Sequence, residues 1–397
     1  MERILLVAND FPYPLNHGAA IDMWWRIQTL KKLGFRVDVV ATVKSMPPEE
    51  DIQALKAEVD QLSIIQRQRG FKSAAGALPF QVQSRAALQT VALSNEYRAV
   101  VMEAEHVASI LQNPSLRAHK RILRLHNDEV RFFQELSKSS KNLLRKAFYQ
   151  SEAVKFRVLS RKIMSRCDAL WFISDYERKQ YVKKHPADRK KAFFVPPRVD
   201  CNAMRRQSLE GCRVLFIGTL ALANNSSAVE WYVSRVHQLL CDVVGYNVVV
   251  AGNTVGKSTG VLKRAVAPYP NITLIENPKE IESLYGRAAV FVNPVLRGAG
   301  LKLKTIDAIQ AGMPIVTTST GVEGTGLVHG KHLLIADSPR SFADCVRTLL
   351  HDKPLARTLV AAAQKFVARE FDQEKIIKDS LDALHESGKA KVVDVDG

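Results

Sequence analysis

The sequence predicts an α/β protein made of two doubly wound, Rossmann-like domains that face each other across a central cleft. Short apolar runs rich in β-branched residues alternate with segments of helical periodicity along nearly the whole chain. This alternation is typical of parallel sheets covered by helices on both faces. A polar stretch with two prolines, residues 195–212, interrupts the alternation near the middle of the 397 residues. A boundary between two domains of similar size is expected there.

The expected elements follow in order along the chain. In the first half the predicted strands are Arg3–Val7, Val37–Ala41, Ala99–Met102, Arg121–Leu125 and Ala169–Ile173, with helices at Ala20–Leu33 and Glu50–Leu62. In the second half the predicted strands are Arg213–Ile217, Tyr246–Ala251, Ile272–Ile275, Val290–Val292, Ile315–Thr317 and Leu333–Ile335. The helices between them are Ala228–Leu240, Pro278–Arg287, Leu303–Ala311 and Pro339–Leu350, followed by Phe371–His385. We predict domains over residues 1–197 and 198–370, and a helix and tail over 371–397 that return to the first domain.

Composition narrows the class of protein. Hydrophobic residues make up 46% and charged residues 24% of the chain, which is ordinary for a soluble globular protein. No apolar run is long enough to cross a bilayer. The five cysteines show no CxxC spacing, which favours a reducing cytoplasm over a disulfide framework. The formal net charge of +17 predicts attraction to phosphate-bearing substrates, an anionic membrane surface or nucleic acid.

A glycine-rich loop follows the predicted strand Val290–Val292. Gly298 and Gly300 precede the start of a helix, where free N–H groups and the helix dipole favour a bound phosphate. Arg297, Lys302 and Lys304 add positive charge beside these amides, and Asp307 lies within the helix. We interpret this loop as a phosphate site; the alternative is a glycine-rich turn with solvated lysines.

The segment from Asn293 to Pro314 resembles the donor-site signature of retaining glycosyltransferase family 4, whose members have the two-domain GT-B fold. In that family two acidic residues spaced by seven line the donor site. Asp307 takes the place of the second acid, whereas Ala299 stands where the first is usual, as in the Gly-x-Gly-x-x-x-Lys branch. The resemblance implies a nucleotide-diphosphate sugar as donor substrate, retention at the anomeric carbon, and neither cofactor nor metal.

Further positions match the same family. The strand that ends at Gly218 resembles its donor loop, but Ala221–Asn225 replace the usual Arg and Lys pair. Other matches follow the later strands and the first strand of the chain. The donor-binding set implied by the resemblance is Gly18, Gly218, Asn225, Gly252, Asn277, Ile281, Arg297, Gly298, Gly300, Leu301, Lys302, Lys304, Asp307 and Glu323. For most of these residues taken singly, a structural role is the alternative.

The acceptor side is predicted from the strand that ends at Leu125. His126 follows it, at the place where family members often carry a histidine, and imidazole suits hydrogen bonding or proton transfer with a hydroxyl near neutral pH. We therefore predict His126 as catalytic and Glu105, Asn127 and Glu129 as acceptor-binding residues. Glu103 and His106 are weaker candidates.

Residues 131–166 contain ten Lys or Arg and only two acids, interspersed with apolar side chains. This pattern indicates basic amphipathic helix, which binds anionic lipid or presents a solvated charged face. The first interpretation places the protein in the cytoplasm at the inner face of a membrane and suits a polyprenol- or lipid-linked acceptor. Nucleic acid is the least favoured partner because no RNA-binding motif accompanies the basic residues.

The predicted function is transfer of a sugar from a nucleotide-diphosphate sugar to a hydroxyl of a glycan or lipid-linked acceptor, in surface polysaccharide or glycoconjugate assembly. Two alternatives remain open: a nucleotide-sugar epimerase with the same architecture, and a non-catalytic protein that binds nucleotides or polyanions.

Overall fold

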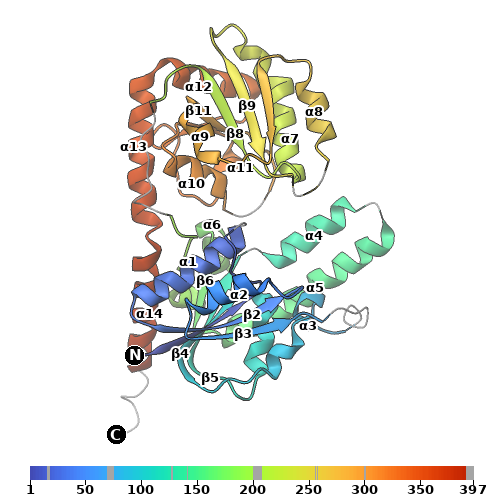
Figure 1. Ribbon diagram of the computed structural model, residues 1–397, viewed down its shortest axis with the longest axis vertical. Helices are drawn as coiled ribbons and strands as arrows, with labels where there is room; N and C mark the ends of the chain where they lie inside the picture. Colours follow the sequence, from blue (N-terminus) through green and yellow to red (C-terminus); the bar gives the residue numbers. More distant parts are fainter. Residues whose placement is uncertain are drawn as a thin grey trace. The chain divides into compact units, whose positions relative to one another are not determined.

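The computed structural model describes residues 1–15, 18–68, 76–126, 128–140, 142–199, 208–254, 256, 258–298 and 301–389, and side chains up to residue 385 (Figure 1). The chain forms two compact units. The first contains Met1–Arg198 together with the chain from Gln373, and the second contains Val199–Asp372.

The first unit is built on a seven-stranded sheet of order β3-β2-β1-β4-β5-β6-β7, in which all neighbours pair parallel. Its strands are β1 Arg3–Ala8, β2 Arg36–Val43, β3 Gln61–Gln66, β4 Glu96–Glu103, β5 Arg117–Leu125, β6 Ala169–Phe172 and β7 Ala192–Phe194. Its α-helices are α1 Gly18–Lys32, α2 Glu49–Lys56, α3 Phe80–Gln83, α4 Glu129–Ser139, α5 Leu143–Arg166, α6 Asp175–Lys184 and α14 Gln373–Lys389, and a 3₁₀ helix covers Glu105–Gln112.

Two apolar layers cover the faces of this sheet. Alternate residues of β1 point to opposite faces, so Ile4 packs in a cluster with Ile27 of α1, and Leu5 packs in another with Phe156 of α5. Helix α14 belongs to the α1 layer through Ile377, which is fully buried. The last helix of the chain therefore completes the core of the first unit.

The second unit has a six-stranded parallel sheet of order β10-β9-β8-β11-β12-β13. Its strands are β8 Arg213–Ile217, β9 Asn247–Gly252, β10 Ile272–Glu276, β11 Val290–Asn293, β12 Ile315–Thr317 and β13 Leu334–Ile335. Its α-helices are α7 Ala223–Trp231, α8 Gly260–Val266, α9 Ile281–Gly286, α10 Leu303–Gln310, α11 Ser319–Val322, α12 Pro339–His351 and α13 Lys353–Glu370. Because β9, β8 and β11 are neighbours in the sheet, the strand ends at which the predicted donor residues lie are side by side.

The predicted strands are confirmed, with some ends shifted, but the predicted helix Glu50–Leu62 is wrong in its second half. Helix α2 ends at Lys56, and Gln61 begins the edge strand β3, which pairs with β2. Asp60 fixes this turn, since its carboxylate accepts a hydrogen bond from the N–H of Val37 at 2.9 Å. Pairing between strands thus overrides a local helical pattern.

The predicted helix Ala228–Leu240 is helical throughout but not a single α-helix. Helix α7 begins earlier, at Ala223, and after Trp231 the chain continues as a π-turn over Tyr232–Val236 and a 3₁₀ turn over His237–Leu240. The wider turn directs Tyr232, Val233 and Val236 into the core. Across the described ranges, no helix is long and apolar enough to span a membrane.

Candidate functional site

In the second unit, the ends of β8 and β9 approach more closely than side chains permit. A Cβ atom on Gly252 would lie 1.7 Å from the carbonyl oxygen of Gly218, and the N–H of Gly218 donates to the carbonyl of Ala251 at 3.1 Å. Gly252 is therefore required by backbone packing, whereas a Cβ on Gly218 would meet the side chain of Asn225 at 3.0 Å. Both glycines also leave the backbone of this strand end free of side chains.

Asn225 connects this strand end to the basic helix α10. Its side chain is buried near the start of α7, and Nδ2 donates to the carbonyl of Thr219 at 2.9 Å. Oδ1 accepts a hydrogen bond from Nζ of Lys304. Asn225 thus links Lys304 to the strand end at Gly218, so that three predicted donor residues lie together.

Lys302 and Lys304 lie at the start of α10, and both are withdrawn from bulk solvent. Nζ of Lys302 donates to the carbonyl of Gly298 at 2.9 Å, and the residue is 8% exposed. Burial, with the neighbouring charge of Lys302, lowers the pKa of Lys304 to about 8. The two ammonium groups form a concentrated positive charge next to the glycine-rich loop.

A buried network of hydrogen bonds connects the strand before the glycine-rich loop to the helix after it. Nδ2 of Asn293, at the end of β11, donates to Oγ1 of Thr305 at 3.0 Å and to the carbonyl of Gly321 at 3.1 Å. Oγ1 of Thr305 donates to the same carbonyl at 2.9 Å. Asn293 and Thr305 were not predicted as site residues, although a polar residue at the end of an apolar strand is a signal that the sequence contains.

The other predicted donor residues of the second unit are more exposed. Arg297 and Asp307 are exposed, Gly298 and Leu301 are half-buried, and Gly300 lies outside the described residues. Ile281 is the first residue of α9 and is 40% exposed, and Glu323 is half-buried after α11.

Asn277 has a structural contact beside its predicted role. It lies in the left-handed region at φ 49°, where asparagine is tolerated, and its Oδ1 accepts from the N–H of Thr254 at 3.0 Å. The remaining predicted donor residue, Gly18, begins α1 of the first unit, where a Cβ would meet no atom within 4 Å.

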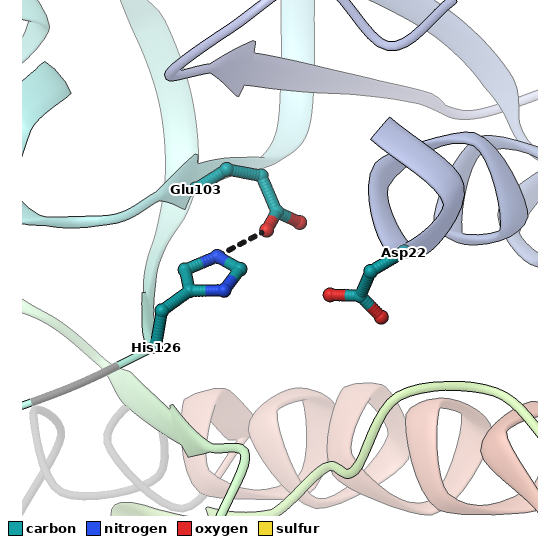
Figure 2. A group of neighbouring side chains, drawn as sticks. All are labelled: Asp22, Glu103 and His126. Atoms are coloured by element: carbon teal, nitrogen blue, oxygen red, sulfur yellow. Dashed lines mark hydrogen bonds and ion pairs between the residues drawn. The ribbon is translucent and has the colours of Figure 1, made fainter. Parts of the chain in front are cut away.

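In the first unit, His126 is joined to a buried carboxylate. The residue follows β5, and Glu103 ends the neighbouring strand β4. Nε2 of His126 lies 3.0 Å from Oε2 of Glu103. Figure 2 marks this contact with a dashed line. The side chain of His126 is 20% exposed and that of Glu103 is fully buried. The imidazole is therefore partly exposed, while its carboxylate partner lies wholly in the interior.

Two buried arginines neutralise this carboxylate and a second one. Nε of Arg26 donates to Oε1 of Glu103 at 2.8 Å, and Nη2 of Arg124 donates to Asp22 at 2.7 Å. Burial raises the pKa of both acids, but the guanidinium charges outweigh it. The pKa of Asp22 falls to about 2, and that of Glu103 lies below its usual value.

Asp22, Arg26 and Arg124 were not predicted as site residues, and Glu103 was only a weaker candidate. A signal was present, because Arg124 interrupts an apolar strand and Asp22 and Arg26 share one side of a helix at i, i+4 spacing. Charges on buried positions indicate partners, but only the strand order β1-β4-β5 shows which ones.

Asp22, Glu103 and His126 also have the composition of a metal site. One ligand atom from each lies within 4.8 Å of the others. However, both carboxylates already accept hydrogen bonds from guanidinium groups. These arginines supply the charge that a cation would otherwise provide, so the cluster is explained without an ion.

The predicted acceptor residues are distributed differently. Glu105 is 3% exposed, and burial raises the pKa of its carboxyl to about 8. A hydrogen bond with Ser160 of α5 lowers this pKa, but its effect is smaller than that of burial. Glu129 begins α4, and its carboxylate lies 3.4 Å from Nε2 of His106. Asn127 lies outside the described residues. The structure thus gives Glu105 an interior position rather than a contact with His126.

The sequence of this chain is similar to those of known proteins. The family of glycosyl transferases group 1 matches residues 211–352. An uncharacterized 44.6 kDa protein in the cps region of Klebsiella pneumoniae is 32% identical over 389 residues, which are 95% of this chain and 98% of the relative.

Solved structures of similar fold cover the whole chain. Sucrose-phosphate synthase from Thermosynechococcus elongatus has a TM-score of 0.67 at 15% identity and covers 99% of both chains. HepE of Anabaena, solved in complex with UDP-glucose, has a TM-score of 0.66 at 11% identity, covering 97% of this chain and 100% of its own. At these identities the likeness establishes the fold, which is GT-B. The chain belongs to the family of the Klebsiella protein and is a glycosyltransferase of GT-B fold, with its glycosyl transferases group 1 domain in the second unit.

Proposed function

We propose that the protein transfers a sugar, with retention at the anomeric carbon, from a nucleotide-diphosphate sugar to a hydroxyl of a glycan or lipid-linked acceptor. The observation that carries the proposal is that Lys304 and Asn225 meet at the glycine-lined ends of β8 and β9, while the neighbouring Lys302 bonds to the carbonyl of Gly298 in the glycine-rich loop. Positive charge beside an unobstructed backbone suits a diphosphate.

The two lysines would act on the leaving group. As the bond from the anomeric carbon to the phosphate oxygen breaks, negative charge develops on the nucleoside diphosphate. Ammonium groups fixed in a partly buried site stabilise that charge more than they would in water. Because protein cations supply the neutralising charge, we propose that transfer needs no metal ion.

The acceptor would bind in the first unit beside His126. The partial exposure of His126 suits a hydrogen bond with a sugar hydroxyl, and the fully buried Glu103 holds its ring through Nε2. The cps-region location of the Klebsiella relative supports a role in surface polysaccharide or glycoconjugate assembly. The basic, apolar surface of α4 and α5 supports a lipid-linked acceptor at a membrane.

The first experiment identifies the donor. A thermal-shift screen with UDP-, GDP-, TDP- and CMP-sugars should raise the unfolding midpoint for one nucleotide class, because a ligand that binds only the folded state stabilises it. HepE was solved with UDP-glucose, which makes UDP-sugars the first class to test.

The second experiment tests the reaction. The selected donor is incubated with lipid-linked glycan acceptors, with and without EDTA, and the product is examined by NMR. The proposal expects acceptor-dependent transfer that EDTA does not abolish and an anomeric configuration equal to that of the donor. Conversion of the donor without acceptor would instead identify an epimerase, and an inverted product would refute retention.

The donor site is tested by the double variant Lys302→Ala, Lys304→Ala. It should lose about 10²-fold or more in kcat/KM for the donor, because two interactions with charged groups are removed. Lys365→Ala, an exposed lysine of α13 in the same unit, serves as the control. Full activity of the double variant would refute the diphosphate assignment.

A further inference from the structure

The hydrogen bond between His126 and Glu103 determines which ring nitrogen carries the proton. Glu103 has a pKa below its usual value, because the Arg26 and Arg124 guanidiniums and the bond to His126 outweigh its burial. Its carboxylate is therefore ionised at neutral pH and only accepts hydrogen bonds. At 3.0 Å, Nε2 of His126 must be the donor. A neutral His126 then has an unprotonated Nδ1.

The free nitrogen has no competing partner in the described part of the chain. No hydrogen bond to Nδ1 of His126 occurs among the described residues, and the side chain is 20% exposed. Figure 2 shows this second nitrogen on the side of the ring away from Glu103. In Figure 2 this nitrogen faces the side on which Asp22 lies, and because it has no hydrogen bond in the described part of the chain, its lone pair can accept one from a hydroxyl.

The surrounding charges are already balanced without the imidazole. Glu103 and Asp22 contribute two negative charges, and Arg26 and Arg124 contribute two positive ones. All four side chains are at most 7% exposed. The four charges therefore balance one another within the interior of the first unit.

We infer that Glu103, held by Arg26 and Arg124, is a positioning residue that fixes the tautomer of His126, so that Nδ1 accepts a hydrogen bond from a substrate hydroxyl. This inference rests on the proposed function for the identity of the hydroxyl. The tautomer itself does not depend on that function. In functional sites, a carboxylate bonded to one ring nitrogen of a histidine commonly sets the orientation and the tautomer of the ring.

The test replaces the carboxylate by an amide in Glu103→Gln. An amide presents either an oxygen or an NH₂ group to Nε2, so the tautomer is no longer fixed. The chain offers a matched control in the pair Glu96–His119, which joins the same two strands at 3.0 Å but is 67% exposed on both sides. Glu96→Gln changes the same chemical group on the same sheet without touching His126.

The first measurement is ¹⁵N NMR of histidine-labelled protein, with His126→Asn used to assign the His126 signals. Wild type and Glu96→Gln should show His126 with a protonated Nε2 and an unprotonated Nδ1. Glu103→Gln should show a mixture of tautomers. A protonated Nδ1 with unprotonated Nε2 in wild type, or an unchanged signal in Glu103→Gln, would overturn the inference. If Glu103→Gln does not fold, the wild-type spectrum alone still decides the tautomer.

The second measurement is the kinetics of transfer. Glu103→Gln should lower kcat/KM for the acceptor by about tenfold, as expected for one misoriented hydrogen bond, while KM for the donor stays unchanged. Glu96→Gln should match wild type in both. If the expected tautomer is found but no donor supports transfer, the proposed function fails while the tautomer assignment stands. If transfer occurs and Glu103→Gln leaves the acceptor kinetics unchanged, the positioning role fails.

Discussion

Lys304 carries its charge only over part of the accessible pH range. Burial beside Lys302 lowers its pKa to about 8, so the ammonium group is charged below this pH and increasingly neutral above it. A phosphate bound at this lysine would favour the charged form. The affinity of the free enzyme for its donor should therefore depend on pH in the mildly alkaline range.

We predict that Kd for the nucleotide-sugar rises about tenfold between about pH 7 and about pH 9, as Lys304 loses its proton. Lys304→Arg keeps its charge throughout this range and should flatten the dependence. Isothermal titration calorimetry across the pH series measures both. An equally steep rise in the arginine variant would show that another group is responsible.

Gly252 is required by the approach of two strand ends. Since a Cβ at this position would overlap the carbonyl oxygen of Gly218 at 1.7 Å, the backbone of β8 or β9 would have to move. We predict that Gly252→Ala lowers the free energy of unfolding of the second unit by about 1–3 kcal/mol and weakens donor binding.

The control for this prediction is Gly260→Ala. Gly260 begins α8, and its Cβ would lie 3.4 Å from Oγ of Ser258, at ordinary contact distance. Its substitution should change the unfolding free energy by less than about 0.5 kcal/mol. Chemical denaturation of both variants makes the comparison, and equal stabilities would contradict the steric argument.

At the level of elements, α4 and α5 form a helical hairpin with two different surfaces. Phe133 of α4 stacks on Phe156 of α5 with ring centroids 5.5 Å apart, and Ser137 donates to the carbonyl of Lys146. In contrast, Leu143 and Leu144 at the start of α5 are 81% and 83% exposed. Two consecutive exposed leucines next to Arg145 and Lys146 are suited to an anionic lipid surface.

We propose that these leucines insert into membranes, and we predict that Leu143→Ser, Leu144→Ser reduces binding to phosphatidylglycerol-containing vesicles by about tenfold or more. Co-sedimentation measures the bound fraction. Val244→Ser, at a residue 92% exposed in the second unit, is the control. Unchanged binding of the leucine variant would leave α4 and α5 as a solvated surface.

At the level of the whole molecule, the chain returns to its first unit after building its second. Helix α14 fills the α1 layer with Ile377, and Oγ of Ser380 accepts a hydrogen bond from Nε1 of the buried Trp171 at 2.7 Å. Gln373, where the helix begins, donates to the carbonyl of Pro196 at 2.9 Å. The core of the first unit is therefore complete only once α14 has been synthesised.

We predict that Ile377→Ala destabilises the first unit by about 2–4 kcal/mol, because it leaves a cavity in a fully buried site. Asp379→Ala, at an exposed position on the same helix, should cost less than about 0.5 kcal/mol. Urea unfolding followed by tryptophan fluorescence measures both. A small effect of the isoleucine change would mean that α14 contributes little to the stability of the core.

Much of the fold follows from the sequence because it is encoded locally. Parallel strands buried on both faces are apolar runs, and the helices between them repeat with their own period. The edge strands β3 and β7 were not predicted. The first is only half-buried and the second has three residues, so neither shows a clear pattern.

The candidate donor loop could be proposed from the sequence for the same reason. The basic residues and glycines from Arg297 to Lys304 are neighbours along the chain, so their charge and backbone freedom can be read together. The contacts that support this loop could not be predicted, because Asn225 accepts a hydrogen bond from Lys304 but lies on another helix, far away in the sequence.

The sequence by itself determined two α/β domains, a basic glycine-rich loop and a histidine at the end of a strand. Only the tertiary structure decided which charged groups surround that histidine, because they come from α1, β4 and β5. Asp22, Arg26, Glu103 and Arg124 are separated by up to 102 residues, and the parallel sheet order brings them together. Charge pairing in the interior depends on distance in space, which residue order alone does not specify.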